Sequence, residues 1–121
     1  MKPYNQLSNK GKHRRLHALA VAGLAHYDLL NPKIEFLCFN TNLLYQVTTQ
    51  TGEKFIFRLA SPGWRTYQDL LSEAIWLTAL EQETNIPIPG VIPNRSGGYV
   101  LSLMLPGIPK IWHMTLMRWL P

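Results

Sequence analysis

The segment KFIFRL, residues 54–59, decides the fold of this 121-residue chain. Its large apolar side chains recur at every second position, a period that predicts a β-strand with one face in a core. Residues 50–53 before it and residues 61–63 after it contain glycine or proline and are typical of turns. Arg58 departs from this pattern, because it places a permanent positive charge among apolar neighbours.

Further strands are predicted on both sides of this segment. Residues 34–38 and 43–49 precede it through short polar links, which favours an antiparallel meander. Residues 99–103 and 111–119 are predicted as the fourth and fifth strands, and residues 85–89 as a proline-stiffened connector.

Two helices complete the predicted fold. Apolar residues recur at helical spacing over residues 13–27. A second helix is predicted over residues 66–83, because Thr66 and Asp69 have the spacing of a capping box. We therefore expect an α+β fold with a five-stranded antiparallel sheet, the second helix on one face of it, and the other helix preceding it.

The second predicted helix contains a carboxylate on its apolar side. Glu73 lies on the same stripe as Leu70, Ala74 and Leu77. An unpaired carboxylate in an apolar interface costs several kcal/mol. We therefore expect Glu73 to have a cationic partner across the interface.

The chain is basic, with a formal net charge of +5. The charge is concentrated near the start, at Lys2, Lys10, Lys12, Arg14 and Arg15. Residues 1–12 are polar and are predicted to form a flexible basic tail. Such a tail can contact nucleic acid or an anionic surface, although a solvated flank is the commoner role.

Several classes of site are not supported by the sequence. A single cysteine, Cys38, excludes an internal disulfide and a cysteine-based zinc site. The histidines lack metal-ligand spacing, so we predict no metal site. No apolar run reaches the ~18 residues that span a bilayer. We expect a cytoplasmic protein without a membrane segment, which suits the single thiol.

The order of the predicted elements is similar to that of the N-terminal lobe of protein-kinase-like enzymes. Five stretches carry a closer resemblance: FNTNLLYQV (39–47), KFIFRLASP (54–62), SEAIWLTAL (72–80), IPIPGVI (86–92) and LMRWLP (116–121). Together they resemble the aminoglycoside phosphotransferase family, which includes choline-kinase-like and homoserine-kinase-like enzymes. The resemblance implies that residues 13–121 form a kinase-like nucleotide-binding lobe.

Two residues of unusual character match functional positions of that lobe. Arg58 resembles the lysine of the third strand, which contacts the α- and β-phosphates, and Glu73 resembles the helix C acid that orients this cation. A planar guanidinium can bind phosphate oxygens and a carboxylate together. The alternative is that Arg58 and Glu73 form only a stabilising ion pair.

The resemblance also implies contacts with the rest of the nucleotide. Asn40, Thr41 and Asn42 match the phosphate-covering loop, although this loop contains no glycine, and a polar hairpin turn is the alternative. The adenine would be contacted by the side chains of Leu44, Ile56 and Met117 and by backbone groups of Arg118 and Leu120. Apolar side chains at such positions can equally belong to a core.

The cofactor implied by the resemblance is ATP with Mg²⁺, and the acceptor is the hydroxyl group of a small molecule. In this family a second, helical lobe carries the catalytic Asp of a His-Gly-Asp motif and the Asp that binds magnesium. No His-Gly-Asp occurs in these 121 residues. We therefore expect a truncated phosphotransferase that has no catalytic or metal-binding residue of its own, is inactive alone, and leaves substrate binding to the missing lobe.

Two other functions stay open. The chain could be a non-catalytic fragment that self-associates, or binds a partner chain supplying the second lobe, through an apolar patch of Trp112, Met117, Trp119 and Leu120. It could also be a small basic nucleic-acid-binding domain, which the net charge favours. Nucleic acid is the less favoured partner, because aromatic and cationic residues do not interleave on one face as stacking platforms require.

Overall fold

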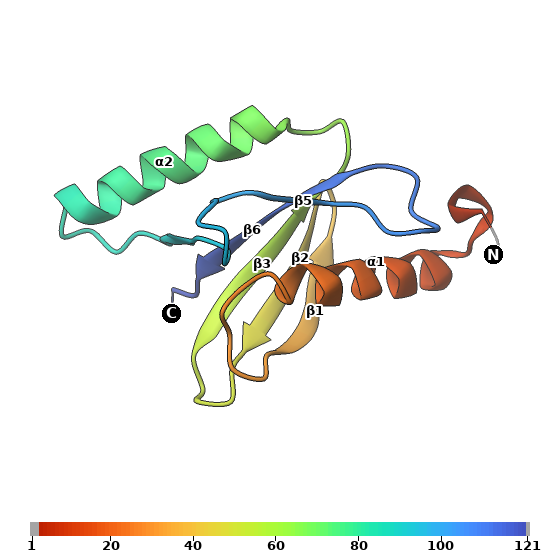
Figure 1. The fold of residues 1–121 in the computed structure, drawn as a ribbon, viewed down its shortest axis with the longest axis horizontal. Coiled ribbons are helices and arrows are strands. Elements are labelled where there is room, and N and C mark those ends of the chain that lie inside the picture. Colours follow the sequence, from red (N-terminus) through yellow and green to blue (C-terminus); the bar gives the residue numbers. More distant parts are fainter. Residues whose placement is uncertain (1–2, 121) are drawn as a thin grey trace.

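The computed structural model describes residues 3–120, so Lys2 of the basic segment and Pro121 lie outside the described residues. The fold is α+β (Figure 1). Its elements are η1 (Tyr4–Gln6), α1 (Asn9–Leu24), β1 (Lys33–Phe39), β2 (Asn42–Thr48), β3 (Lys54–Ala60), α2 (Tyr67–Glu83), β4 (Val91–Ile92), β5 (Leu101–Leu103) and β6 (Trp112–Arg118). Within the described range, no helix combines the length and apolar character needed to cross a membrane.

The strands form one antiparallel sheet in the order β1-β2-β3-β6-β4, and β5 also pairs with β6. The sheet has six strands, one more than predicted. The additional strand is β4, whose two residues are too few to show a period. Val91 pairs with Met117 and Leu101 pairs with Met114, so β4 and β5 occupy successive parts of the same β6 edge.

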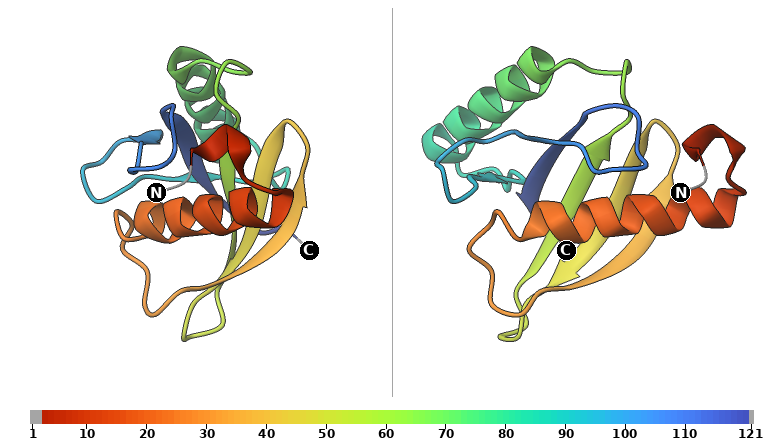
Figure 2. Two further views of the ribbon diagram at one scale, coloured as in Figure 1. Left: turned by 90° about the vertical axis from the view of Figure 1, so that its right-hand side faces the viewer. Right: turned by 45° about the vertical axis from the view of Figure 1, so that its right-hand side comes forward.

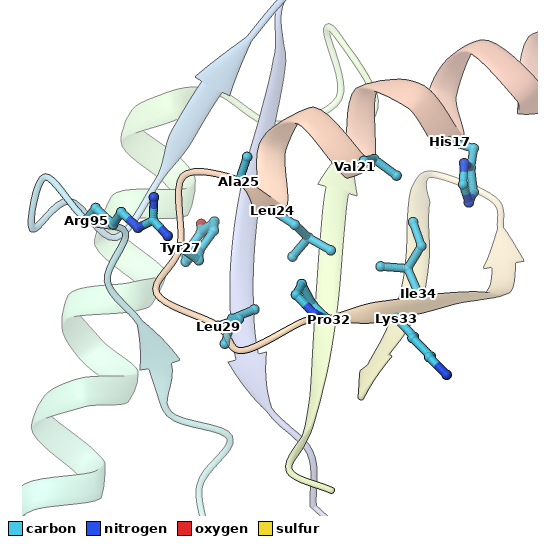
Figure 3. Close-up of a pocket in the computed structure, with 10 residues that line it drawn as sticks. All are labelled: His17, Val21, Leu24, Ala25, Tyr27, Leu29, Pro32, Lys33, Ile34 and Arg95. Atoms are coloured by element: carbon cyan, nitrogen blue, oxygen red, sulfur yellow. The ribbon is translucent and has the colours of Figure 1, made fainter. Parts of the chain in front are cut away.

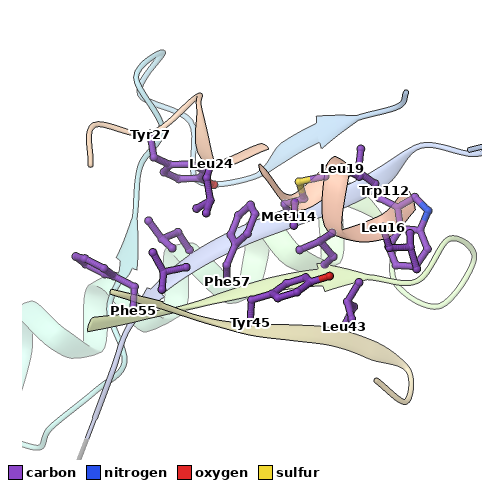
Figure 4. Close-up of a cluster of buried hydrophobic side chains, with 14 of the residues drawn as sticks. Leu16, Leu19, Leu24, Tyr27, Leu43, Tyr45, Phe55, Phe57, Trp112 and Met114 are labelled. Carbon is purple, nitrogen blue, oxygen red and sulfur yellow. The ribbon is translucent and has the colours of Figure 1, made fainter. Parts of the chain in front are cut away.

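The main core lies between α1 and the sheet (Figure 4). Alternation directs every second side chain of β2, β3 and β6 into it. The buried strand residues are Leu43, Tyr45, Val47, Phe55, Phe57, Leu59, Trp112, Met114 and Leu116. Leu16, Leu19, Ala20 and Leu24 complete it from α1. The sequence predicted that the second helix covers the sheet. In the structure, α1 buries the larger share of the apolar surface of the sheet.

The first helix begins earlier than predicted. Ser8 is its N-cap, and the Ser8 Oγ accepts a hydrogen bond from the Gly11 N–H at 3.2 Å. The helix starts at Asn9, which corrects the predicted boundary at residue 13. With η1 before it, much of the described part of the segment predicted as a flexible tail is helical.

The second helix begins with the predicted capping box. The Thr66 Oγ1 accepts from the Asp69 N–H, and the Asp69 carboxylate accepts from the Thr66 N–H, both at 3.1 Å. Leu70 and Ala74 are the buried residues of this helix, whereas Leu77 and Leu80 are half-buried. Two further views show α2 well separated from α1 (Figure 2). α2 therefore packs on the molecule through a small apolar contact.

The last strand does not form the predicted apolar patch. Trp112 is 5% exposed, because it faces α1 together with Met114 and Leu116. Met117 points to the opposite face of the sheet and is half-buried, and Leu120 is exposed. The prediction that Trp112 belongs to an exposed apolar patch is therefore wrong.

Candidate functional site

Arg58 lies on the face of the sheet opposite α1. The apolar residues that were predicted to contact adenine lie on the same face. Arg58 pairs with Leu44 of β2 on one side and with Thr115 of β6 on the other. In the next row, Ile56 pairs with Met117. Directly paired residues of antiparallel strands share a face. Leu44, Ile56 and Met117 are each half-buried there, which leaves part of their surface open.

Arg58 is fixed by two different partners. Its Nε donates to the buried Thr115 Oγ1 at 3.2 Å, and its Nη2 donates to the Glu73 Oε1. The side chain of Arg58 is 11% exposed. Since a guanidinium has five N–H donors, these two bonds leave donors of Arg58 for a further acceptor.

Glu73 has the cationic partner that the sequence predicted, and a second one. Its Oε1 pairs with Arg58, while its Oε2 accepts from the Arg65 Nη1 at 2.8 Å. The carboxylate side chain is 26% exposed. The predicted contact between Arg58 and Glu73 is confirmed, and the two arginines explain how a carboxylate is tolerated on this side of α2.

The environment of Glu73 favours its ionised form. Burial acts to raise the pKa of this carboxyl, but the hydrogen bonds and positive charges of Arg58 and Arg65 outweigh burial and lower the pKa. Glu73 is thus an anion at neutral pH. It can orient Arg58, but it has no proton to give and its two oxygens are already engaged.

Arg65 was not predicted to belong to the site. It lies directly before the N-cap Thr66, and about two helical turns separate it from Glu73. The sequence feature that could have indicated Arg65 is its position, a cation directly before a helix whose apolar side carries the acid Glu73. Such a cation is disfavoured by the helix dipole, so its position called for a partner.

The predicted phosphate loop connects β1 and β2. Asn40 and Thr41 are exposed, and Asn42 is half-buried at the start of β2. The Asn40 N–H donates to the Asn42 carbonyl at 3.2 Å, and the Thr41 carbonyl accepts from the Ser61 N–H at 3.2 Å. The loop is therefore tied to Ser61, which directly follows β3 and is three residues beyond Arg58.

The segment predicted to contact adenine through its backbone is partly engaged within the chain. The Arg118 N–H donates to the Gly90 carbonyl at 2.9 Å, so this donor is engaged within the chain, while the backbone contact of Arg118 with adenine stays a prediction. The Arg118 side chain pairs with Glu81 of α2 at 2.8 Å. This ion pair packs against Gly90, where a Cβ would collide with both side chains. Leu120, two residues further on, is exposed.

A cavity of about 630 Å³ lies on the other side of the molecule (Figure 3). Its lining is mainly apolar and comes from the end of α1, the segment after it and the start of β1, with His17, Lys33 and Arg95 as its basic residues. None of the residues predicted to bind nucleotide lines this cavity. It is therefore separate from the candidate site around Arg58.

The candidate site does not fit a magnesium ion by itself. In residues 3–120, no three His, Cys, Asp or Glu side chains gather as metal ligands. Glu73 is the acid nearest to Arg58 in this arrangement, and two guanidiniums occupy its oxygens. The described residues can supply hydrogen-bond donors to phosphate oxygens, but not a carboxylate site for a cation.

The chain is similar to known proteins both in sequence and in fold. Residues 40–121 match the profile of the phosphotransferase enzyme family. The structure is similar to a microcompartment-associated aminopropanol kinase with a TM-score of 0.74 and 24% sequence identity. That similarity covers 86% of this chain and 31% of the kinase chain, so this chain spans less than a third of that protein. No curated protein sequence matches. With more than half of its residues in the match, the chain belongs to the phosphotransferase enzyme family, as its resemblance to aminoglycoside phosphotransferases predicted.

Proposed function

We propose that this chain is the nucleotide-binding lobe of an ATP-dependent phosphotransferase whose acceptor is a hydroxyl group of a small molecule. The observation that carries the proposal is the state of Arg58. It lies on the half-open face of the sheet, fixed by Thr115 and Glu73, with N–H donors to spare. A cation oriented in this way is suited to the phosphates of a nucleotide.

The other residues have roles consistent with this position of Arg58. Leu44, Ile56 and Met117 offer an apolar surface in the neighbouring rows of the sheet, suited to a purine ring. Asn40, Thr41 and Asn42 would contact phosphate oxygens from the loop above the end of β3. The remaining adenine contacts would come from the Arg118 carbonyl and from the backbone of Leu120.

Catalysis would need groups that residues 3–120 do not bring together. Phosphoryl transfer requires a bound metal ion and a residue that positions the acceptor hydroxyl. We place both outside this chain, in a second lobe that further residues or a partner chain would supply. The kinase of similar structure is named for an amino alcohol. At its level of identity, that likeness supports the class of acceptor and leaves the particular alcohol open.

Isothermal titration of the 121-residue chain with ATP and with adenosine tests the proposal. We expect both to bind, ATP more tightly. Arg58→Ala should weaken ATP binding by roughly 10- to 100-fold, the value of a charge-assisted hydrogen bond, and adenosine binding much less. Arg14→Ala, which removes the same charge from the exposed side of α1, is the matched control. Equal ATP affinity in the Arg58 and Arg14 variants would refute the role of Arg58.

The same samples test the expected lack of turnover. With ATP, magnesium and a panel of alcohols, the chain alone should release no ADP above the background without protein. Magnesium-dependent ADP release that Arg58→Ala abolishes would show that the chain carries a complete site.

A further inference from the structure

The backbone of Arg65 is fixed on both sides. Before it, the turn that follows β3 is closed by a hydrogen bond from the Trp64 N–H to the Ser61 carbonyl at 3.1 Å, with Gly63 at a φ of 82°. After it, the capping box of Thr66 and Asp69 fixes the first turn of α2. The position of Arg65 relative to the helix is therefore set by the chain itself and does not depend on Glu73.

Arg65 and Arg58 bind different oxygens of the same carboxylate. Arg65 Nη1 lies 2.8 Å from Glu73 Oε2, and Arg58 Nη2 contacts Oε1. The two arginines come from different elements, the link before α2 and the centre of β3. Glu73 would thus keep an ion pair if Arg58 turned part of its guanidinium towards another acceptor.

The second arginine also changes the charge of the site. Arg58 and Glu73 alone would be neutral as a pair, and the carboxylate would repel an approaching phosphate. With Arg65, the three groups carry a net charge of +1. Because charges in a partly desolvated site interact more strongly than in water, this difference should favour a polyanion.

We propose that Arg65 is a positioning residue of the nucleotide site, which anchors Glu73 independently and leaves Arg58 available to the phosphates. This inference rests on the proposed function. A purely structural role for Arg65 would tie the start of α2 to its second turn and have no effect on phosphate affinity. The two roles therefore differ in how ATP and adenosine respond to substitution.

Titration calorimetry with ATP and adenosine distinguishes these roles. Arg65→Gln should weaken ATP binding by roughly tenfold, the scale of one charge-assisted hydrogen bond lost at the site, and leave adenosine binding unchanged. Arg65→Lys should retain part of the affinity, because it keeps the charge but not the planar geometry. Arg14→Gln controls for the loss of one positive charge. ATP affinity in Arg65→Gln equal to that in Arg14→Gln would overturn the proposal.

A second measurement needs no ligand. The carboxyl carbon of Glu73 can be titrated by NMR, with the Glu73→Gln variant to separate it from Asp69, one turn earlier on α2. The charged groups that contact Glu73 are Arg58 and Arg65. In Arg58→Gln the pKa of Glu73 should stay below its ordinary value, and adding Arg65→Gln should raise it.

The two measurements separate the inference from the function on which it rests. If the unmodified chain binds neither ATP nor adenosine, the proposed function fails for this chain, and the NMR titration alone decides whether Arg65 anchors Glu73. If Arg58→Gln by itself removes the whole depression of the Glu73 pKa, Arg65 is no independent anchor and the inference is wrong.

Discussion

At the residue scale, Glu73 joins α2 to the sheet through a single carboxylate that two guanidiniums share. Arg58 reaches it from the sheet and Arg65 from the link before the helix. Removing one partner of such a group leaves the others with an uncompensated charge. The stability contributed by Glu73 should therefore depend on its own state of ionisation.

Replacing Glu73 by Gln should show this dependence directly. The pKa of Glu73 is lowered in the folded chain, whereas an unfolded Glu titrates near about 4.3. A lowered pKa means that folding favours the anion, so the contribution is complete above the unfolded pKa and is lost as pH falls through the folded one. We expect the free energy of unfolding of Glu73→Gln to be about 1–2 kcal/mol lower at pH 7. Urea denaturation at several pH values should show this difference shrinking below pH ~4.

The matched control is Glu83→Gln, an exposed residue at the end of the same helix. Its free energy of unfolding should follow that of the unmodified chain across the pH range. A deficit in Glu73→Gln that stays constant from pH 7 to pH 3 would mean that the ion pairs are not its source.

Two glycines of α1 should respond to alanine in opposite ways. A Cβ on Gly23 would lie 2.6 Å from the Met114 Sδ and 3.1 Å from the Phe57 ring, both in the core. On Gly11 it would meet Leu7 and Ser8 at 3.4 Å or more, an ordinary contact. Gly23→Ala should cost about 1–3 kcal/mol through overpacking, whereas Gly11→Ala should stabilise by up to ~1 kcal/mol through helix propensity. Thermal denaturation compares them, and a stabilised Gly23→Ala would show that the core yields easily.

At the element scale, the two helices are attached by different kinds of interaction. α1 buries Leu16, Leu19, Ala20, Gly23 and Leu24, whereas α2 buries Leu70 and Ala74. Where further leucines could have packed, α2 instead presents Glu73 and Glu81 to arginines of β3 and β6. Exposed ion pairs contribute little to stability, so α2 depends mainly on Glu73 and one short apolar contact.

Amide hydrogen exchange should therefore be faster in α2 than in α1. Segments with few buried apolar contacts open at lower free energy than the core elements. Mass spectrometry of peptides after exchange in D₂O is expected to show protection falling from the start of α2 towards Glu83. Arg118→Ala should increase exchange near Glu81 and leave α1 unchanged. Equal protection of both helices would contradict this account.

At the scale of the whole molecule, several large apolar side chains stay exposed on α2 and just before it. Trp64 is 60%, Ile75 55% and Trp76 62% exposed. Ile75 and Trp76 are consecutive residues of α2, and exposed apolar patches mark surfaces that bind a partner. We predict that the isolated chain self-associates or binds a partner chain, and that this region of α2 takes part in the contact.

Sedimentation velocity at micromolar concentration tests this expectation. The unmodified chain should sediment as more than a monomer, and Trp76→Lys should shift it towards the monomer. Val21→Lys, at an exposed position of α1, serves as the control. A monomer that binds no hydrophobic dye would show that this surface needs no cover.

Several features of the fold and site could be predicted from local patterns. Alternation in residues 54–59 and the capping box at Thr66 led to β3 and to the start of α2. Glu73 on an apolar stripe led to its contact with Arg58. In each case the signal lies within a few neighbouring residues, where periodicity and side-chain chemistry decide the outcome. The nucleotide roles of these residues stay predictions.

What could not be predicted depends on tertiary contacts. The role of α1 follows from the close approach of Gly23 to Met114. These residues are 91 positions apart in the chain, so no local sequence pattern predicts that they meet. The strand β4 is defined by its pairing with the edge of β6, because its own two residues are too few to show a strand pattern. The engaged N–H of Arg118 likewise depends on where the segment at Gly90 lies.

The position of α1 has a practical consequence for anyone who divides this chain into pieces. The family match begins at residue 40, beyond α1 and all of β1. A fragment trimmed to that boundary would keep every residue proposed to bind nucleotide, yet uncover Tyr45, Phe57 and Met114, which are now at most 2% exposed. Such a fragment should be insoluble when expressed, because the segment that matches the family lacks the helix that covers the core.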